Sequence, residues 1–302
     1  MATRTPQSLL RLTGQLWRPL VPIVIYVGLI SWLDLTYHLE TYNLPIQLVS
    51  IPGTVIGLLL AFRTNSAYCR WWEARTIWGA IVNDSRTWVR QLIIFVEGGN
   101  APTDADPWLR QMAYRQIAWC YSLTRSLLRQ EPLGDVADIL DAADIEEFQL
   151  HANVPNAILL KQGRELRQAY GKNRLETYQF VELERTLKRL TDSMGACERI
   201  KNTPFPKSYG ILVKCLSYLF IALLPFGLTR MPAIGLIVTS LSLAAAFLVI
   251  DLVAIYLQDP FENRPSDTPM LTLTRTIETN IRQMLGETEP TGPPDAVSGS
   301  ES

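Results

Sequence analysis

The sequence predicts an all-α integral membrane protein with four transmembrane helices and a helical cytoplasmic domain. Of its 302 residues, 48% are hydrophobic and only 19% are charged, whereas soluble domains carry about a quarter charged residues. The apolar residues are concentrated in four stretches, each long enough to supply the about 20 apolar residues that a membrane span needs. The region between the second and third stretches shows apolar residues at helical spacing and no strand pattern.

The four predicted spans form two closely spaced pairs. The first pair covers about Leu20–Leu39 and Leu44–Phe62, and the second covers about Tyr209–Leu228 and Ala233–Leu257. Four such segments paired around short turns are unusual in a soluble fold. The first span is too long for the apolar region of a signal peptide, and no small-residue cleavage site follows it.

The basic residues around the spans predict the orientation of the chain. Basic side chains precede the first span, follow the second and precede the third: Arg4, Arg11, Arg18, Arg63, Arg70, Arg75, Lys201 and Lys207. The turn within the first pair contains no Lys or Arg, and the turn within the second pair contains only Arg230. Because Lys and Arg are enriched on the cytoplasmic side of membranes, we expect both termini and the central region to be cytoplasmic.

The spans divide the chain into five segments. Residues 1–62 contain an N-terminal segment and the first two spans, residues 63–208 a cytoplasmic helical domain, and residues 209–257 the last two spans. Residues 258–286 form a cytoplasmic C-terminal segment. The composition of residues 287–302 predicts a disordered tail.

Four helices and a shorter fifth are predicted in the cytoplasmic domain. The first, Arg63–Val96, continues directly from the second span and places aromatic and aliphatic residues at intervals of three, four or seven: Trp71, Trp78, Ile81, Trp88, Leu92 and Phe95. The segment GGNAPTDADP then ends this helix. Asp106 and Pro107 are a capping residue and a first-turn proline, which start a helix that runs to about Arg129. The acidic EPLGDVADILDAADIEEF predicts a loop and a short helix.

Prolines and glycine mark the remaining cytoplasmic helices. One begins at Pro155 and ends near Gly171, and the last runs over about Leu175–Arg199. The prolines of NTPFP stop the last helix before the third span.

Motifs for catalysis, metal binding and cofactor binding are missing. The cysteines, Cys69, Cys120, Cys197 and Cys215, form no CxxC pair, and neither His38 nor His151 has a zinc-ligand spacing to them. There is no glycine-rich phosphate loop and no GxSxG motif. A net charge of −1 also argues against a nucleic-acid partner. We therefore expect no enzyme activity, no cofactor and no metal.

Two parallel stripes run along the second span. Gly53 and Gly57 are small residues that allow close helix packing. Thr54, Leu58 and Phe62 form an adjacent stripe at intervals of four residues. This second stripe either contacts lipid or another helix, or faces an axis surrounded by copies of the same helix. In the second case its side chains form hydrophobic rings, which gate a pore by excluding water.

Asp251 is a charge within a predicted span, so it is a candidate functional residue. It either faces the outer vestibule or pairs with Lys214 on the neighbouring span. Lys214 lies within about two turns of the cytoplasmic end of its own span, so it can also extend to the headgroup region.

Several motifs together resemble those of the bestrophin family of ion channels. They are Ile51-Pro52, the run FRTNSAYCRWWEARTIWG, the segment GACERIKNTPFPKSY and the motif Gln258-Asp259-Pro260-Phe261. They surround all four spans, so the resemblance extends from about Leu9 to Arg282. The FRTNSAYCRWWEARTIWG run is especially similar to bacterial members.

The resemblance implies a homopentamer with one central pore in the inner (plasma) membrane of the cell. It implies a pore neck lined by Thr54, Leu58 and Phe62, with a Thr where the family usually has an Ile. It also implies a second constriction, at the cytoplasmic exit, close to Tyr178. Implied partners are further copies of this chain, membrane lipids and small monovalent ions.

Animal members of the family also carry an acidic calcium-binding run after the last span. Here DPFENRPSDTPM supplies only Glu262 and Asp267 near that place. Calcium prefers six to eight oxygen ligands, so we expect no calcium site.

The resemblance leaves the ion and part of the function open. The leading hypothesis is passive conduction of chloride or other small anions through a pore gated by the hydrophobic neck. An alternative is a sodium-type cation channel of the same fold, because the neck carries no charge. A second alternative is a membrane-anchored helical interaction protein without a pore, which predicts that the Thr54, Leu58 and Phe62 stripe is buried within its own subunit. The missing internal repeat disfavours an ion-coupled transporter.

Overall fold

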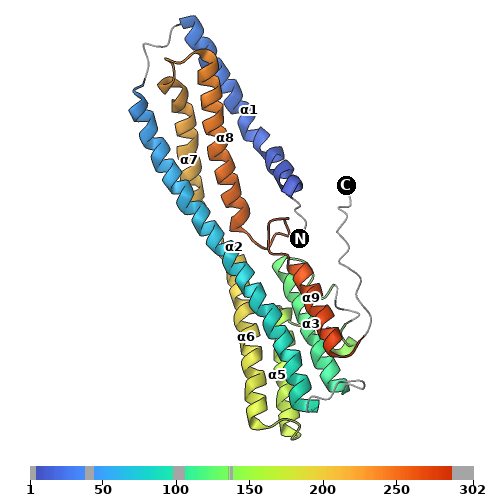
Figure 1. The fold of residues 1–302 in the computed structure, drawn as a ribbon. Coiled ribbons are helices and arrows are strands. Elements are labelled where there is room, and N and C mark those ends of the chain that lie inside the picture. The colour runs from blue at the N-terminus through green and yellow to red at the C-terminus, as the bar shows by residue number, and fades with distance from the viewer. Residues whose placement is uncertain (1–4, 38–43, 98–105, 135, 137–138, 288–302) are drawn as a thin grey trace. The chain divides into compact units, whose positions relative to one another are not determined.

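The computed structural model describes residues 5–37, 44–97, 106–134, 136 and 139–287, in a chain that divides into two compact units. The first unit comprises residues 1–72, 204–260 and 264–267, and the second comprises residues 73–203, 261–263 and 268–302. Within the described ranges every regular element is helical (Figure 1).

Four helices of the first unit are long and apolar enough to cross a membrane, which confirms the four predicted spans. They are α1 (Thr5–Tyr37), the first part of α2 (Ile46–Glu97), α7 (Lys207–Leu223) and α8 (Ala233–Gln258). A short 3₁₀ turn, Leu224–Gly227, follows α7. Helix α1 begins well before the predicted first span, and the last two residues of that prediction lie outside the described residues.

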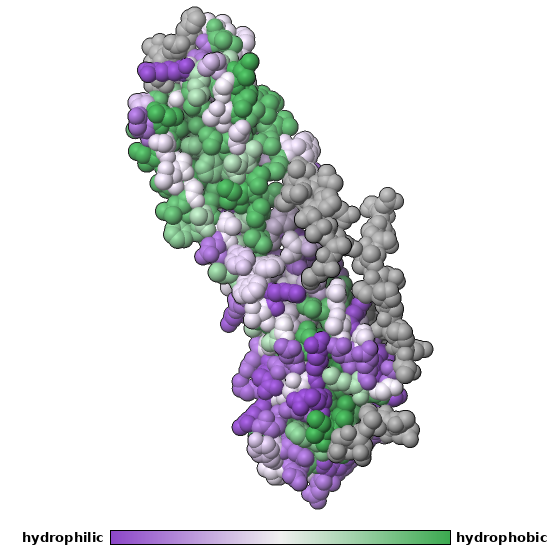
Figure 2. All heavy atoms as spheres, viewed as in Figure 1, coloured by the Kyte–Doolittle hydropathy of each residue, from purple (hydrophilic) through white to green (hydrophobic). Residues whose placement is uncertain are grey.

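The surface of the first unit is mostly apolar. Only 22% of the most apolar window of α8 is buried, and Figure 2 shows hydrophobic residues over most of this unit's visible face. Exposing so much apolar area to water costs about 25 cal/mol per Å², whereas a bilayer accommodates it. The core of the unit is small and is formed by Ile23, Val27, Ile56, Leu60, Val213, Phe220, Leu236 and Ala244.

Helix α2 is one continuous helix of 52 residues, as predicted for the second span and the cytoplasmic helix after it. At 1.5 Å per residue it is about 78 Å long, more than twice the about 30 Å of a bilayer core. Its part in the second unit buries Trp78, Ile81, Trp88 and Leu92 completely. The spacing of these side chains in the sequence therefore identified the packed face of the helix correctly.

The other predicted helices of the second unit are present. They are α3 (Pro107–Leu127), the short α4 (Ala142–Gln149), α5 (Val154–Gly171) and α6 (Thr177–Asn202). The capping prediction at the start of α3 is confirmed, because the Asp106 carboxylate accepts a hydrogen bond from the Trp108 backbone N–H at 2.9 Å. Residues 98–105 of the predicted break after α2 and residues 288–302 of the predicted disordered tail lie outside the described residues. Glu287, the first residue of that tail, is described and accepts a hydrogen bond from the Tyr114 hydroxyl at 2.8 Å.

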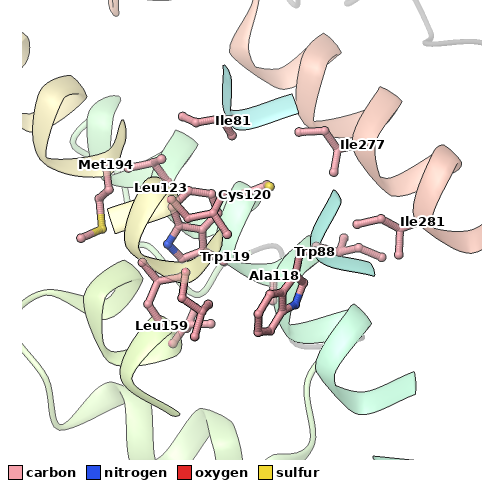
Figure 3. Close-up of a cluster of buried hydrophobic side chains, with 14 of the residues drawn as sticks. Ile81, Trp88, Ala118, Trp119, Cys120, Leu123, Leu159, Met194, Ile277 and Ile281 are labelled. Atoms are coloured by element: carbon pink, nitrogen blue, oxygen red, sulfur yellow. The ribbon is translucent and has the colours of Figure 1, made fainter. Parts of the chain in front are cut away.

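Helix α9 (Met270–Met284) was not predicted. It packs Ile277 and Ile281 into the core of the second unit, the buried cluster that also contains Trp88 and Trp119 (Figure 3). Its buried face also carries polar residues: Thr274 lies 3.1 Å from the Thr124 hydroxyl, and Glu278 accepts a hydrogen bond from the Tyr121 hydroxyl at 2.7 Å. The helix could have been found from the sequence, because apolar residues recur at helical spacing along it: Met270, Leu273, Ile277, Ile281 and Met284.

We expect Ile277→Ala to lower the free energy of unfolding of the second unit by about 2–5 kcal/mol, because Ile277 is fully buried and the change leaves a cavity. The measurement is chemical unfolding of the detergent-solubilised protein followed by tryptophan fluorescence. Thr276→Ala on the exposed face of α9 is the control and should change the stability by about 0.5 kcal/mol or less. Equal losses for the two variants would show that α9 does not pack as described.

Candidate pore-lining site

The three residues of the predicted neck lie on an outward face of α2. Leu58 and Phe62 have 57% and 59% of their surface exposed, and Thr54 is exposed as well. The opposite face of α2 buries Ile56 and Leu60 almost completely against the other helices of the first unit. The packing of a single subunit therefore leaves the stripe uncovered.

This outcome contradicts the alternative of a helical interaction protein without a pore. That alternative predicts that the stripe is buried against the subunit's own helices, and all three of its residues are exposed. The stripe is available to line a pore between copies or to meet lipid.

The exposed stripe extends beyond the neck in both directions. Residues seven and eleven positions apart lie on the same face of an α-helix, and Gln47, Asn65 and Cys69 occupy such positions relative to Thr54 and Phe62. All three are exposed. These three residues were not predicted to belong to the stripe, although their spacing of seven or eleven residues is visible in the sequence. The neck residues thus belong to a longer face that carries both polar and apolar groups.

The Thr54 hydroxyl already has a partner for its proton. It donates a hydrogen bond to the Ser50 carbonyl one turn earlier, at 3.0 Å. Its oxygen keeps lone pairs that accept hydrogen bonds. Thr54 therefore presents an acceptor and a methyl group, rather than a donor, to whatever passes this face.

The two glycines occupy different environments. A Cβ atom at Gly53 would lie 2.9 Å from the ring of Phe220 on α7, so a side chain there would displace the ring. A Cβ at Gly57 would meet nothing within 4 Å. Gly57 instead lines a cavity of about 450 Å³ together with Leu60, Ala61 and Ile250. The predicted helix-packing role thus has a contact within the subunit at Gly53 only.

Three polar contacts hold α2 against α7 and α8 within the first unit. The Tyr209 hydroxyl donates to the Leu59 carbonyl at 2.9 Å, and Arg70 Nε donates to the Gln258 carbonyl at 3.1 Å. Between them, Arg63 forms an ion pair with Asp251 that is almost completely buried. Such contacts fix the rotation of α2 about its own axis and so determine which face points outward.

The ion pair corrects the prediction for Asp251. This carboxylate neither faces an outer vestibule nor pairs with Lys214, because Arg63 Nη1 donates to its Oδ1. Arg63 follows Phe62 directly in the sequence, where its position predicts only a charge that flanks the span. Because consecutive residues point about 100° apart on a helix, the arginine enters the core while Phe62 points outward.

Tyr178 lies in the first turn of α6, in the second unit. Its side chain is 72% exposed. The turn is capped by Gln179, whose amide oxygen accepts a hydrogen bond from the Glu176 backbone N–H at 2.9 Å. Tyr178 thus lies in a capped helical turn, and its side chain is exposed to the surroundings of the subunit.

Glu262 and Asp267, the two acidic residues near the place of the family's calcium-binding run, contact neighbouring groups. The Glu262 carboxylate lies 2.8 Å from Lys201 Nζ. The Asp267 carboxylate accepts a hydrogen bond from the Arg264 backbone N–H at 3.0 Å. Among the described residues no group of three or more His, Cys, Asp or Glu side chains is placed to hold a metal ion.

The comparison with protein families decides the identity of this fold. A sequence model of the bacterial and fungal bestrophin proteins matches residues 2–283. The chain belongs to the bestrophin family. The resemblance found from the FRTNSAYCRWWEARTIWG run and its companions is therefore confirmed.

Curated relatives of this bestrophin carry names that describe channels. A voltage-dependent anion channel-forming protein from Ralstonia nicotianae is 29% identical over 285 residues, which cover 93% of this chain and 92% of the relative. A protein of the same name from Escherichia coli is 31% identical over 241 residues, covering 80% of this chain and 77% of the relative. The family is one of channels, which confirms that this chain is not an enzyme.

Solved bestrophin structures share the fold. The crystal structure of a bacterial bestrophin homologue from Klebsiella pneumoniae matches with a TM-score of 0.82 and 28% identity, over 90% of this chain and 98% of that one. A variant of that homologue gives a TM-score of 0.83. The all-α class with four membrane-spanning helices is thereby confirmed for this multi-pass membrane protein.

Proposed function

We propose that this bestrophin is a passive channel for chloride and other small anions, assembled as a homopentamer. The observation that carries the proposal is the uncovered stripe on α2, where Thr54, Leu58 and Phe62 are exposed in the isolated subunit. Five copies arranged with these stripes inward would surround one pore. The names of the relatives from Ralstonia nicotianae and Escherichia coli support the choice of anions.

The composition of the stripe favours a pore over lipid as its environment. Gln47, Thr54 and Asn65 place amide and hydroxyl groups on the same face as Leu58 and Phe62. Polar side chains in the membrane avoid lipid and face a bundle interior or a water-filled cavity. A face that combines such groups with Leu58 and Phe62 fits a pore that holds water at both ends and excludes it at its centre.

The neck is proposed to gate by excluding water. Leu58 and Phe62 are one helical turn apart, so five copies would form two successive apolar rings. A narrow apolar ring loses its water and blocks ions until it widens. We also propose that Tyr178 forms a second constriction, that the protein resides in the plasma membrane, and that both termini are cytoplasmic.

A cation channel of the same fold is the second candidate, and one observation favours it. The Thr54 hydroxyl proton is used within α2, so the neck offers oxygen lone pairs rather than O–H donors. Oxygen acceptors coordinate cations, whereas anions are bound by donors.

Reversal potentials of the purified protein in a planar bilayer test the ion sign. With a gradient of KCl across the bilayer, we expect the reversal potential to approach the equilibrium potential of chloride. A value that approaches the equilibrium potential of potassium would overturn the anion proposal and leave the cation channel. Absence of any current from protein of confirmed pentameric mass would contradict both.

Cys69 provides a test of the α2 stripe that needs no new side chain. It lies seven residues after Phe62 and is exposed, so it faces the pore if Phe62 does. We expect a charged methanethiosulfonate reagent to reduce flux in proteoliposomes to less than about half, because a charged adduct on five copies obstructs the conduit. The thiols of Cys120 and Cys197 will not interfere, because burial raises the pKa of each to about 12 and keeps it protonated.

Cys69→Ser is the matched control and should conduct normally and resist the reagent. An equal response in the wild type and in this variant would show that another thiol is responsible. Labelling of Cys69 without any change of flux would contradict the assignment of this face to the pore.

A further inference from the structure

A second polar site lies within the first unit, on the face of the Arg63–Asp251 pair that opens toward α7. It is a cavity of about 330 Å³ between the end of the α2 span, the start of α7 and the end of α8. Arg63, Lys207, Lys214 and Asp251 contribute its charges, and Ile211 and Ile255 contribute apolar walls. None of these residues belongs to the exposed α2 stripe.

The cavity has an excess of positive charge. Its wall contains three cationic side chains and one carboxylate, and that carboxylate is already paired with Arg63. Neither Lys207 nor Lys214 forms an ion pair with any residue that the structure describes. The cavity therefore lacks the negative charge that would balance it.

The buried arginine is an independent observation that points to a ligand. Arg63 is 7% exposed, and its Nε–H has no hydrogen-bond partner among the described groups. A buried donor without a partner costs about 1–3 kcal/mol. One acceptor oxygen from an anion in the cavity would remove this cost if it reached the guanidinium.

Lys207 and Lys214 are spaced so that both side chains can contact one anion, from two positions along α7. Lys207 and Lys214 are seven residues apart on one face of α7, which separates them by about 10 Å along the helix axis. Lys207 is also the first residue of α7, where backbone N–H groups of the first turn have no partner within the helix. Side chains and helix end therefore present donors to the same region.

The position of the cavity indicates an amphiphilic ligand. Lys214 lies about two turns inside an apolar span, and Ile211 beside it is 62% exposed. A water-borne anion would have to enter the apolar layer to meet Lys214. A phospholipid keeps its phosphate at the membrane interface, where the extended side chain of Lys214 can reach it, and lays its acyl chains over Ile211.

We propose that this cavity binds the headgroup phosphate of an anionic phospholipid from the leaflet on the basic side of the membrane. Arg63, Lys207 and Lys214 contact the phosphate, and Asp251 holds Arg63 in place. Basic pockets between membrane helices bind anionic headgroups in this way. The proposal goes beyond conduction, and its test is independent of ion flux.

Native mass spectrometry of the full-length protein with added phosphatidylglycerol tests the site. Each basic residue near the surface contributes about 1 kcal/mol to anionic-lipid binding, so the Lys207→Gln/Lys214→Gln variant should bind about 25-fold more weakly than the wild type. A Lys172→Gln/Lys188→Gln variant removes two exposed lysines from the second unit and should bind as the wild type does. Lys214→Arg, which keeps the charge, should also retain binding.

Two results with phosphatidylglycerol would overturn the proposal. One is equal phosphatidylglycerol binding by the wild type and the Lys207→Gln/Lys214→Gln variant. The other is displacement of the bound lipid by millimolar inorganic phosphate, which would make the cavity a site for free anions. Phosphatidylcholine, which has no net charge, should bind with the same affinity to all variants; a 25-fold loss for this lipid as well would refute recognition by charge.

Discussion

Replacing both Leu58 and Phe62 with alanine should raise anion flux through proteoliposomes by about tenfold. The reason is the proposed hydrophobic neck: each alanine shortens an exposed apolar side chain on the α2 stripe, and in the proposed pentamer every ring would lose five such groups at once. A wider and less apolar ring holds water more easily. A reduction of about 1.4 kcal/mol in the barrier to ion passage is sufficient for a tenfold increase in rate.

The measurement is chloride efflux at matched protein content, after the pentameric mass of the variant has been confirmed. Leu219→Ala/Val238→Ala is the control, because these side chains are similarly exposed on α7 and α8 but lie away from the stripe. It should leave flux unchanged. Unchanged or lower flux in the Leu58→Ala/Phe62→Ala protein, with normal assembly, would place the neck elsewhere.

Much of the fold could be predicted because the strongest signals are local. The four spans follow from apolar length, and the start of α3 follows from Asp106 and Pro107. Continuity of α2 from the membrane into the second unit follows from the spacing of Trp78, Ile81 and Trp88. Helix α9 was missed although Met270, Leu273 and Ile277 recur at helical spacing. Its sequence could not show that Thr274 and Glu278 also face the core, where each has a hydrogen-bond partner on α3.

The candidate site could likewise be predicted only in part. The neck stripe could be chosen from its four-residue spacing, and its exposure in the subunit is a tertiary property that a sequence does not contain. The partner of Asp251 was assigned wrongly for the same reason. In the sequence Lys214 is the cation on a neighbouring span, whereas the position of Arg63 predicts only a flanking charge. Which of the two enters the core depends on the rotation of α2.

The second large effect is expected when Asp251 is replaced by leucine. Arg63 would then remain as a buried cation with no counter-ion, because its own exposure is only 7%. Removing one partner of a buried pair costs about 3–5 kcal/mol. We expect a loss of this size in the free energy of unfolding, measured in detergent without phospholipid so that no headgroup replaces the carboxylate.

A second substitution distinguishes loss of the ion pair from simple loss of packing as the cause of the destabilisation. The Arg63→Leu/Asp251→Leu variant removes both charges, and replacing a buried pair by apolar side chains is often neutral or stabilising. It should therefore recover most of the loss. Lys214→Leu removes the cation that the sequence favoured; because Lys214 is exposed, it should change the stability by about 0.5 kcal/mol or less. A double variant as unstable as Asp251→Leu, or a Lys214→Leu protein that loses as much, would show that Asp251 is not held by Arg63.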